Sequence, residues 1–254
     1  MTAEPSVTRP GDDASPDQRD NQHRGFEVAL GYLDAQILAG RLSNGSQLPP
    51  ERDLALQLGV SRGAVREAIR ALQAQGIIVT QLGRGHGTRI QSTPSSVLGR
   101  ILRLQLALDG LSFADLTETR IALEGAACAA AARHRHPEAL SRAAALLDQM
   151  AGIHDRDRFN SLDTDFHVTL AEAGGNRLTR ELTAAIRQVL QVPIRAAEDA
   201  VGDWPRLRQV LVTEHTGIYQ AIRAGDEDLA AQRAKSHIRN AYSMLQARPD
   251  LPLG

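Results

Sequence analysis

The sequence lacks disulfide-forming cysteines and long uncharged apolar runs, and each absence excludes a class of protein. Cys128 is the only cysteine, so an internal disulfide is excluded and a reducing compartment is favoured. The apolar stretches are short, rich in alanine and interrupted by arginine, aspartate or histidine. None of them approaches the roughly 20 residues that a helix needs to span a bilayer. We therefore expect a protein without a membrane partner.

The first residues also lack the features of an export signal. Glu4, Asp12 and Asp13 lie among prolines, and no apolar segment accompanies them. The sequence therefore predicts a cytoplasmic protein. Residues 1–23 are rich in proline, aspartate, serine and glutamine, and they have too few large apolar residues to offset the entropy lost on ordering. We expect them to form a disordered tail.

The composition is that of a globular protein with room for two domains. Of the 254 residues, 42% are hydrophobic and 23% are charged. The overall charge of -1 is unevenly spread, because residues 24–91 contain eight arginines against five acidic residues, a net charge of +3. A small basic excess is also typical of an ordinary solvated surface, so the positions of the arginines decide its meaning.

Residues 24–91 show the element order of a winged helix-turn-helix. Apolar spacing and glycine breaks predict helices over 26–39, from Glu51 to Gly59 and from Ser61 to Gly76. An apolar run then leads through a glycine-rich turn to a second short strand, which predicts a β-hairpin. Three helices followed by a hairpin form a DNA-binding domain of this class.

The rest of the chain reads as helical. Serines and a proline at 92–96 predict a linker, and residues 97–248 have helical periodicity without a run typical of a strand. Breaks at glycines and at a proline divide this region into six or seven helices. We therefore predict a mostly α protein, in which a winged helix-turn-helix is followed by an all-α helical-bundle domain.

The third predicted helix has the residues that a recognition helix requires. Val65 and Ile69 lie on one face, while Ser61, Arg62 and Arg66 occupy the first turns of the opposite face. Arg62 and Arg66 are four residues apart, so they point in the same direction. The planar guanidinium can bind guanine O6 and N7, or a phosphate, through two hydrogen bonds.

Two further segments are placed to contact DNA. Arg52 opens the second helix, where the positive helix terminus supports contact with the phosphate backbone. In the turn Gly83-Arg84-Gly85, glycine permits close approach of the backbone to the minor groove, whose negative potential attracts arginine. Each arginine taken alone is equally well explained as a solvating surface residue, but the combination of helix, turn and wing favours DNA binding.

The segment from Leu48 to Leu72, LPPERDLALQLGVSRGAVREAIRAL, followed by Gly76-Ile77 and the GRG turn, resembles the DNA-binding domain of GntR-type regulators. The resemblance implies a homodimer that represses or activates transcription at a short palindromic operator in double-stranded DNA. Gly63 and Ala64 depart from the threonine and proline, or other hydroxyl residue, common at these positions, which removes base or phosphate contacts. The predicted DNA-binding set is Arg52, Ser61, Arg62, Gly63, Arg66, Gly83, Arg84 and Gly85.

The helical region contains a pattern that suits a divalent metal ion. Asp163 and His167 are four residues apart and share one helical face, and His215 and His237 occur singly on two later helices. A carboxylate and neutral imidazoles are a suitable ligand set for an ion such as zinc. Spacing alone does not bring the four residues together, and single helical histidines are as often surface or hydrogen-bonded residues.

The same pattern resembles the FCD effector domain of the FadR subgroup of GntR regulators, over about Val97 to Ala247. The resemblance implies a divalent ion (zinc, nickel or manganese) bound by Asp163, His167, His215 and His237. It also implies that Arg120 faces the cavity and binds a carboxylate of a small organic-acid effector. An ion pair between Arg120 and Glu124, four residues later, is nearly as plausible a role. Asn176 and Arg195 are weaker candidates for effector binding.

Three functions compete for this chain. In a regulator, the effector shifts the population of dimer geometries that match two half-sites about one DNA turn apart. The alternative is a metal-dependent enzyme with an accessory DNA-binding domain, but no motif supplies a general base and four protein ligands leave the ion less open than a catalytic site. An architectural DNA-binding protein would require a larger basic excess and leaves the histidines without a role. The sequence therefore favours the regulator, and we expect a ligand-responsive repressor that binds DNA as a dimer.

Overall fold

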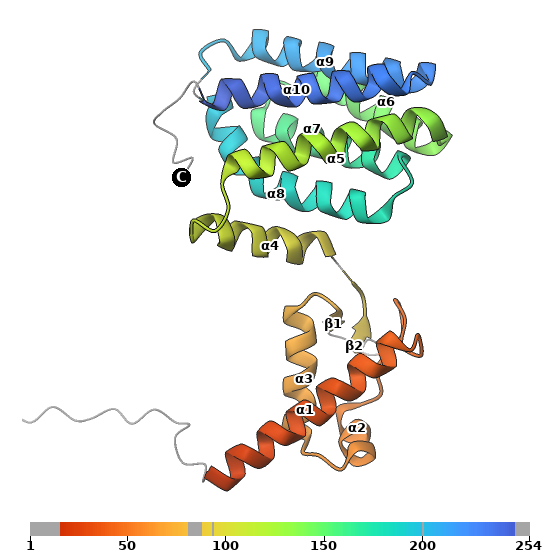
Figure 1. Cartoon of the computed structure of the whole chain (residues 1–254), viewed down its shortest axis with the longest axis vertical. Helices are drawn as coiled ribbons and strands as arrows, with labels where there is room; N and C mark the ends of the chain where they lie inside the picture. Colours follow the sequence, from red (N-terminus) through yellow and green to blue (C-terminus); the bar gives the residue numbers. More distant parts are fainter. Residues whose placement is uncertain (1–15, 81–87, 93, 200, 247–254) are drawn as a thin grey trace, which may run out of the picture. The chain divides into compact units, whose positions relative to one another are not determined.

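A computed structural model describes residues 16–80, 88–92, 94–199 and 201–246 (Figure 1). The chain divides into two compact units, one ending at Thr93 and the other beginning at Pro94. Within the described residues there are ten α-helices and one antiparallel pair of short strands. The mostly α fold expected from the sequence is therefore confirmed.

The N-terminal unit has three helices followed by a two-stranded hairpin, which confirms the predicted winged helix-turn-helix order. Its elements are α1 Pro16–Leu38, α2 Glu51–Leu58, α3 Arg62–Ala74, β1 Ile78–Thr80 and β2 Thr88–Ile90. The strands are antiparallel, and Ile78 lies opposite Ile90, with both side chains buried. The wing residues Gly83, Arg84 and Gly85 lie outside the described residues.

The turn between α2 and α3 depends on Gly59 and Ser61. Gly59 has a φ of 67°, a left-handed conformation that glycine adopts without a steric penalty. The hydroxyl of Ser61 accepts a hydrogen bond from the backbone N–H of Ala64 at 3.1 Å, so Ser61 caps α3 as predicted. The buried stripe predicted for this helix is confirmed at Val65, Ile69 and Leu72.

The first helix is longer than expected. Because α1 begins at Pro16, residues 16–23 belong to a helix, where the sequence predicted part of a disordered tail. Proline is accepted in the first turn of a helix, and Asp20 and Arg24 form an i, i+4 ion pair of 3.4 Å. These local interactions extend the helix although residues 16–23 have few large apolar residues, and the expectation of a disordered tail depended on that lack.

The linker expected at 92–96 is also partly helical, because α4 begins at Pro94. The backbone N–H of Ser95 donates to Oε2 of Glu181 on α8 at 3.1 Å. A carboxylate from a distant helix thus satisfies a free N–H in the first turn of α4. Sequence analysis of 92–96 alone gives no sign of this partner.

The C-terminal unit contains seven helices in its described part, within the predicted six or seven. They are α4 Pro94–Ala107, α5 Phe113–His134, α6 Pro137–Gly152, α7 Arg156–Ala173, α8 Arg177–Asp199, α9 Trp204–Ala224 and α10 Glu227–Gln246. Helix α7 packs against α5, α6 and α8, so it lies inside the bundle (Figure 1). None of the described helices has both the length and the apolar character needed to cross a bilayer.

Helix α7 is buried on more than its apolar face. Phe159, Leu162 and Phe166 are at most 2% exposed and belong to the main hydrophobic core. Asn160 and His167 on the same helix are only 4% and 2% exposed. Helix α7 therefore brings polar side chains into the interior of the bundle, and buried polar groups need partners there.

The contact between Phe159 and Trp204 allows a test of how much the core around α7 contributes to stability. The rings meet edge to face with centroids 5.3 Å apart, and Phe159 is fully buried. We expect Phe159→Ala to lower the free energy of unfolding by about 3–5 kcal/mol, because it removes a large side chain and leaves a cavity. Val210→Ala, at a position 42% exposed on α9, should change it by less than about 0.5 kcal/mol. Chemical denaturation of both variants measures the difference, and equal effects would contradict the core assignment.

Candidate metal centre and DNA-reading helix

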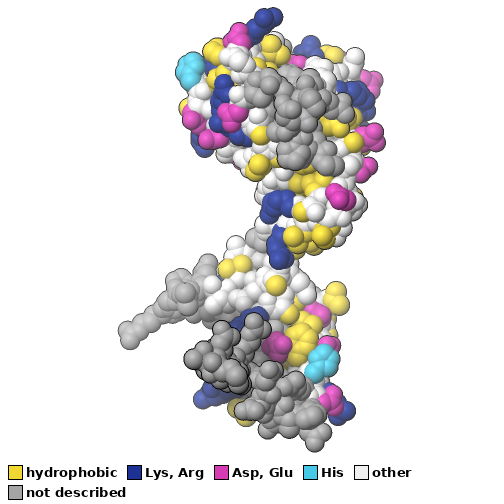
Figure 2. All heavy atoms as spheres, turned by 90° about the vertical axis from the view of Figure 1, so that its left-hand side faces the viewer, with side chains coloured by type: hydrophobic (Ala, Val, Ile, Leu, Met, Phe, Trp, Pro, Cys, Tyr) yellow, Lys and Arg dark blue, Asp and Glu magenta, His cyan; other side chains and the backbone are white. Residues whose placement is uncertain are grey.

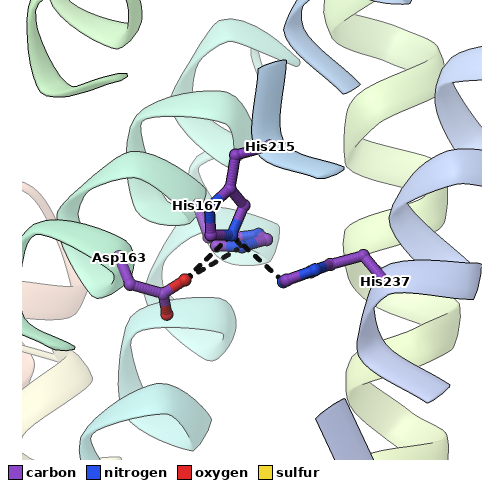
Figure 3. A group of neighbouring side chains, drawn as sticks. All are labelled: Asp163, His167, His215 and His237. Carbon is purple, nitrogen blue, oxygen red and sulfur yellow. Dashed lines mark hydrogen bonds and ion pairs between the residues drawn. The ribbon is translucent and has the colours of Figure 1, made fainter. Parts of the chain in front are cut away.

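Three helices of the C-terminal unit direct four predicted ligands toward one point (Figure 3). Asp163 and His167 come from α7, His215 from α9 and His237 from α10. One potential ligand atom from each residue lies within 4.8 Å of all the others. The structure therefore brings together the four residues that the sequence left as separate candidates.

The distances between the ligand atoms are short. Nε2 of His215 is 3.1 Å from Nε2 of His167 and 3.1 Å from Nε2 of His237. It is also 2.9 Å from Oδ1 of Asp163. The three histidines are at most 3% exposed, so bulk solvent does not screen these nitrogens from one another. Lone pairs of neutral imidazoles repel one another at such distances unless a proton or a cation lies between them.

The spacing fits a shared divalent ion. Two nitrogen ligands that are each about 2.1 Å from one ion are about 3.0 Å apart at a right angle and about 3.4 Å apart in a tetrahedron. The 3.1 Å separations between imidazole nitrogens lie within this range. The donor set of one carboxylate oxygen and three imidazoles is also typical of zinc, nickel or manganese sites.

A buried arginine that the sequence analysis missed holds the acidic side of the cluster. Arg187, on α8, is 2% exposed and donates from Nη1 to Oδ2 of Asp163 at 2.7 Å. Its Nε and Nη2 donate to the two carboxylate oxygens of Glu124 on α5 at 3.0 and 2.9 Å. Oδ1 of Asp163 therefore remains directed toward His215, because Arg187 occupies Oδ2.

The charges around this network keep the ligands in the protonation states that a metal requires. Burial raises the pKa of Asp163, but the charge of Arg187, the hydrogen bond with His215 and the nearby histidines together outweigh it and hold the pKa well below its usual range. Burial and the charge of Arg187 lower the pKa of His167 well below its usual range. Burial and the nearby His215 lower the pKa of His237 to about 4. An ionised carboxylate and neutral imidazoles are metal-binding forms.

The predicted effector residues occupy three different environments. Arg120 is 5% exposed and donates from Nε to Oε1 of Glu124 at 2.7 Å, which is the ion pair that the sequence left open. Asn176 is exposed and accepts from the backbone N–H of Thr179 at 3.1 Å, at the start of α8. Arg195 forms ion pairs with Asp157 and Asp199. Of the three, only Arg120 belongs to the network of buried charges beside the predicted metal ligands.

The described DNA-binding candidates lie on the surface of α2 and α3. Arg52, Ser61, Arg62, Gly63 and Arg66 are all exposed. Arg66 makes a two-pronged ion pair with Glu51 on α2, with Nη2 2.8 Å from Oε2. This hydrogen bond and the charge of Arg66 lower the pKa of Glu51. Sequence analysis did not predict that pair, because the two residues are on different helices.

Glu198 is a second buried charged residue that the sequence analysis missed. It is 7% exposed on α8, and its Oε2 has no hydrogen-bond partner among the described residues. Burial and the negative charge of Asp163 raise its pKa to about 8. Glu198 and Arg187 follow the helical spacing of buried apolar residues on α8, and a charged residue within such a stripe is the signal that would have identified both.

Comparisons with known families cover both units. The family described as "Bacterial regulatory proteins, gntR family" matches residues 27–89, and the family described as "FCD domain" matches residues 115–240. The first match contains the helix-turn-helix and all but the last residue of the hairpin, and the second contains all four predicted metal ligands.

Individual relatives extend over most of the chain. The transcriptional repressor NanR of Edwardsiella tarda (strain FL6-60) is 30% identical and aligns with 85% of this chain and 84% of its own length. The regulator LutR of Bacillus subtilis (strain 168) is 29% identical, with coverage of 82% and 95%. The galactonate operon transcriptional repressor of Escherichia coli (strain K12) is 27% identical, with coverage of 84% and 93%. A solved structure of Streptococcus agalactiae GntR has a TM-score of 0.58 and 24% identity, over 85% of this chain and 98% of that one, and supports the fold.

The raised pKa of Glu198 predicts a pH dependence of stability. The folded pKa is about 8 and the reference value is 4.5, so the folded state holds an additional proton between these values. The contribution of Glu198 to the free energy of unfolding is therefore fully present below pH 4.5 and is lost as the pH rises to about 8. Glutamine does not titrate, so Glu198→Gln should gain stability relative to the native chain on the order of 1 kcal/mol per pH unit across this interval. Urea unfolding at several pH values measures the gain, and a constant difference between the two proteins would contradict it.

Proposed function

The chain belongs to the GntR family of bacterial regulatory proteins and carries an FCD domain, and from this premise we propose a metal-dependent sensor that controls a homodimeric repressor on palindromic DNA. It is a DNA-binding transcription regulator, since the relatives over its length are regulators and repressors rather than enzymes. The finer proposal concerns the ion, the effector, the dimer and the operator. The cytoplasmic location predicted from the sequence stays a prediction.

The convergence of Asp163, His167, His215 and His237 is the observation that carries the proposal. These residues provide one oxygen and three nitrogens in a space that suits one divalent ion of zinc, nickel or manganese. When bound, the ion would supply a positive charge and a Lewis acid to which a carboxylate of the effector can bind. Four protein ligands leave further positions open on an octahedral ion.

The effector that fits the surroundings of the proposed metal site is a small organic acid. Arg120 lies in the same buried network, and among the described contacts only its Nε is engaged, with Glu124. The terminal nitrogens of a guanidinium suit a carboxylate. The name of one relative refers to galactonate, a hydroxylated carboxylate, which supports the same chemical class. Asn176 and Arg195 remain proposed secondary contacts, at the start and toward the end of α8.

An apolar stripe on α4 and the residue that follows it supports the proposed homodimer. Ile101 and Leu104 on α4 are 48% and 49% exposed, and Leu108, directly after the helix, is 74% exposed and continues their spacing. In Figure 2, hydrophobic side chains lie at the surface beside Lys or Arg at the level of α4. A second copy of this chain would bury such a stripe, and two copies related by a twofold axis would match a palindromic operator.

Arg62 is the strongest candidate for reading the operator. It lies in the first turn of α3, is exposed and has no ion-pair partner among the described residues. Arg66 must instead share or exchange its contact with Glu51 before it can bind a base or a phosphate. We therefore assign the principal base contact to Arg62 and a conditional role to Arg66. Arg52 remains the proposed contact to the DNA backbone, Ser61 and Gly63 remain candidates at the start of the recognition helix, and the wing residues, outside the described residues, remain candidates for the minor groove.

The proposed metal site is tested by the metal content of protein purified without a chelator or a histidine tag. We expect near-stoichiometric divalent metal in the native chain, because three buried imidazoles and a carboxylate converge. The double variant His215→Ala/His237→Ala should lose it. His134→Ala/His136→Ala removes two exposed histidines that stack on each other elsewhere and should retain it. Absence of metal from the native chain, even after addition of zinc, nickel or manganese, would exclude the site.

The assignment of Arg62 is tested with a DNA duplex selected in vitro on the native protein. Arg62→Ala should weaken binding to that duplex by about 1–3 kcal/mol, the value of a good two-bond base contact. Arg41→Ala serves as the control, because Arg41 is an exposed residue that donates to Gln36 away from α3. Binding to a scrambled duplex should change much less than binding to the selected one. Equal losses on the two duplexes would indicate a phosphate contact and overturn the base-reading role.

A further inference from the structure

Glu214, on α9, lies behind His237 on the side opposite the metal cluster. Its Oε2 is 2.7 Å from Nδ1 of His237, while Nε2 of the same ring is the atom directed at His215. Oε1 of Glu214 accepts a hydrogen bond from Nδ2 of Asn240 at 2.8 Å. Both oxygens of this carboxylate are thus fixed by α10, and one of them contacts the far nitrogen of a proposed ligand.

His167 also has a carboxylate beside its far nitrogen, from another helix, but this contact lacks the geometry of a hydrogen bond. Oε2 of Glu124 lies 2.7 Å from Nδ1 of His167. Glu124 is 2% exposed and is itself held by Arg120 and Arg187. Nδ1 of His167 and Nδ1 of His215 are both buried without a hydrogen-bond partner among the described residues. Among the described residues, His237 is therefore the one predicted imidazole ligand whose far nitrogen is hydrogen-bonded to a carboxylate.

This arrangement decides which ring nitrogen carries the proton. A neutral imidazole has one N–H and one lone pair, and a carboxylate accepts the N–H on its own side of the ring. With Nδ1 protonated, the lone pair is on Nε2 and points toward the cluster. A carboxylate on the far nitrogen also makes the imidazole a more basic metal ligand.

We propose that Glu214 is a positioning residue that holds His237 in the Nδ1–H tautomer, with its Nε2 atom ready for the ion. The inference rests on the proposed metal site and names a residue that determines its affinity. Glu214 acts through His237 and does not itself touch the ion.

The two carboxylates differ in what their removal does to the fold. Loss of Glu124 would leave the buried guanidinium groups of Arg120 and Arg187 without their shared counter-ion, which destabilises the folded chain. The Glu214 side chain is 23% exposed and borders a surface cavity of about 340 Å³ between α9 and α10. Glu214 is therefore the residue at which positioning of a ligand can be separated from folding.

The test measures zinc affinity of the full chain by competition with a chromophoric chelator, together with the absorption spectrum of the cobalt-loaded protein. We expect Glu214→Ala to weaken zinc binding about 10- to 100-fold, the range for loss of an outer carboxylate. Glu214→Gln should weaken it less, since an amide oxygen still accepts the Nδ1–H but lacks the charge. Both variants should alter the cobalt spectrum, because the orientation and basicity of one ligand change.

Glu172→Ala is the matched control. It removes another carboxylate, 47% exposed, that pairs with Arg142 at 2.7 Å on the surface of the same unit. Its zinc affinity and cobalt spectrum should equal those of the native chain. The thermal midpoint of the metal-free Glu214 variants should also stay at the native value, since the contact is required for the ion and not for the fold.

The outcomes separate this inference from the metal site itself. If the native chain binds neither zinc nor cobalt, the metal site falls, and the inference falls with it. If the native chain binds zinc and the Glu214 variants bind it equally well, the positioning role is overturned while the site stands. A loss of affinity matched by an equal loss of metal-free stability would also overturn it, because the residue would then be purely structural.

Discussion

The buried guanidinium of Arg187 is the interaction on which the helical domain depends. It joins α8 to Glu124 on α5 and to Asp163 on α7, through contacts of 2.7 to 3.0 Å. An isolated charge in this position would be strongly unfavourable, and replacement of one partner of a buried pair commonly costs about 3–5 kcal/mol. The three helices can therefore pack in this way only with all the charges in place. The positions of the four predicted metal ligands depend on this charge pairing, because Asp163 is one of its partners.

The same network explains how acidic and imidazole groups coexist in the interior. The charge of Arg187 and the contacts with His215 and His167 together outweigh the effect of burial on the pKa of Asp163, and the charge of Arg187 also lowers the pKa of His167. Asp163 consequently presents Oδ1 to the cluster while Oδ2 is occupied by Arg187. Helix α8 has a further role at its other end, where Glu181 binds the first turn of α4. One helix thus connects the cluster of Asp163 and the three histidines with the start of the C-terminal unit.

In the N-terminal unit the analogous organising contacts are local. Gly59 and Ser61 form the turn and the cap that set the start of α3, and the ion pair between Glu51 and Arg66 joins α2 to α3 on the exposed side. The arginines near this turn are thereby held on one surface, with the apolar stripe of α3 on the other. The two units use different physical means, one a local turn and the other a long-range network of buried charges.

The features that the sequence by itself determined depend on periodic spacing or on neighbouring residues within one segment. The stripe of Val65, Ile69 and Leu72, the glycine breaks, the hairpin order and the pairing of Asp163 with His167 on one helical face all follow from spacing within one segment. The extent of α1 and the start of α4 did not follow, because a surface ion pair and a distant carboxylate stabilise them. Only the tertiary structure decided that His215 and His237 meet Asp163, and that Arg187 and Glu214 stand behind the ligands. These residues are between 22 and 52 positions apart along the chain in the contacts they make. Such contacts arise from the packing of whole helices, and local spacing carries no information about which helices become neighbours.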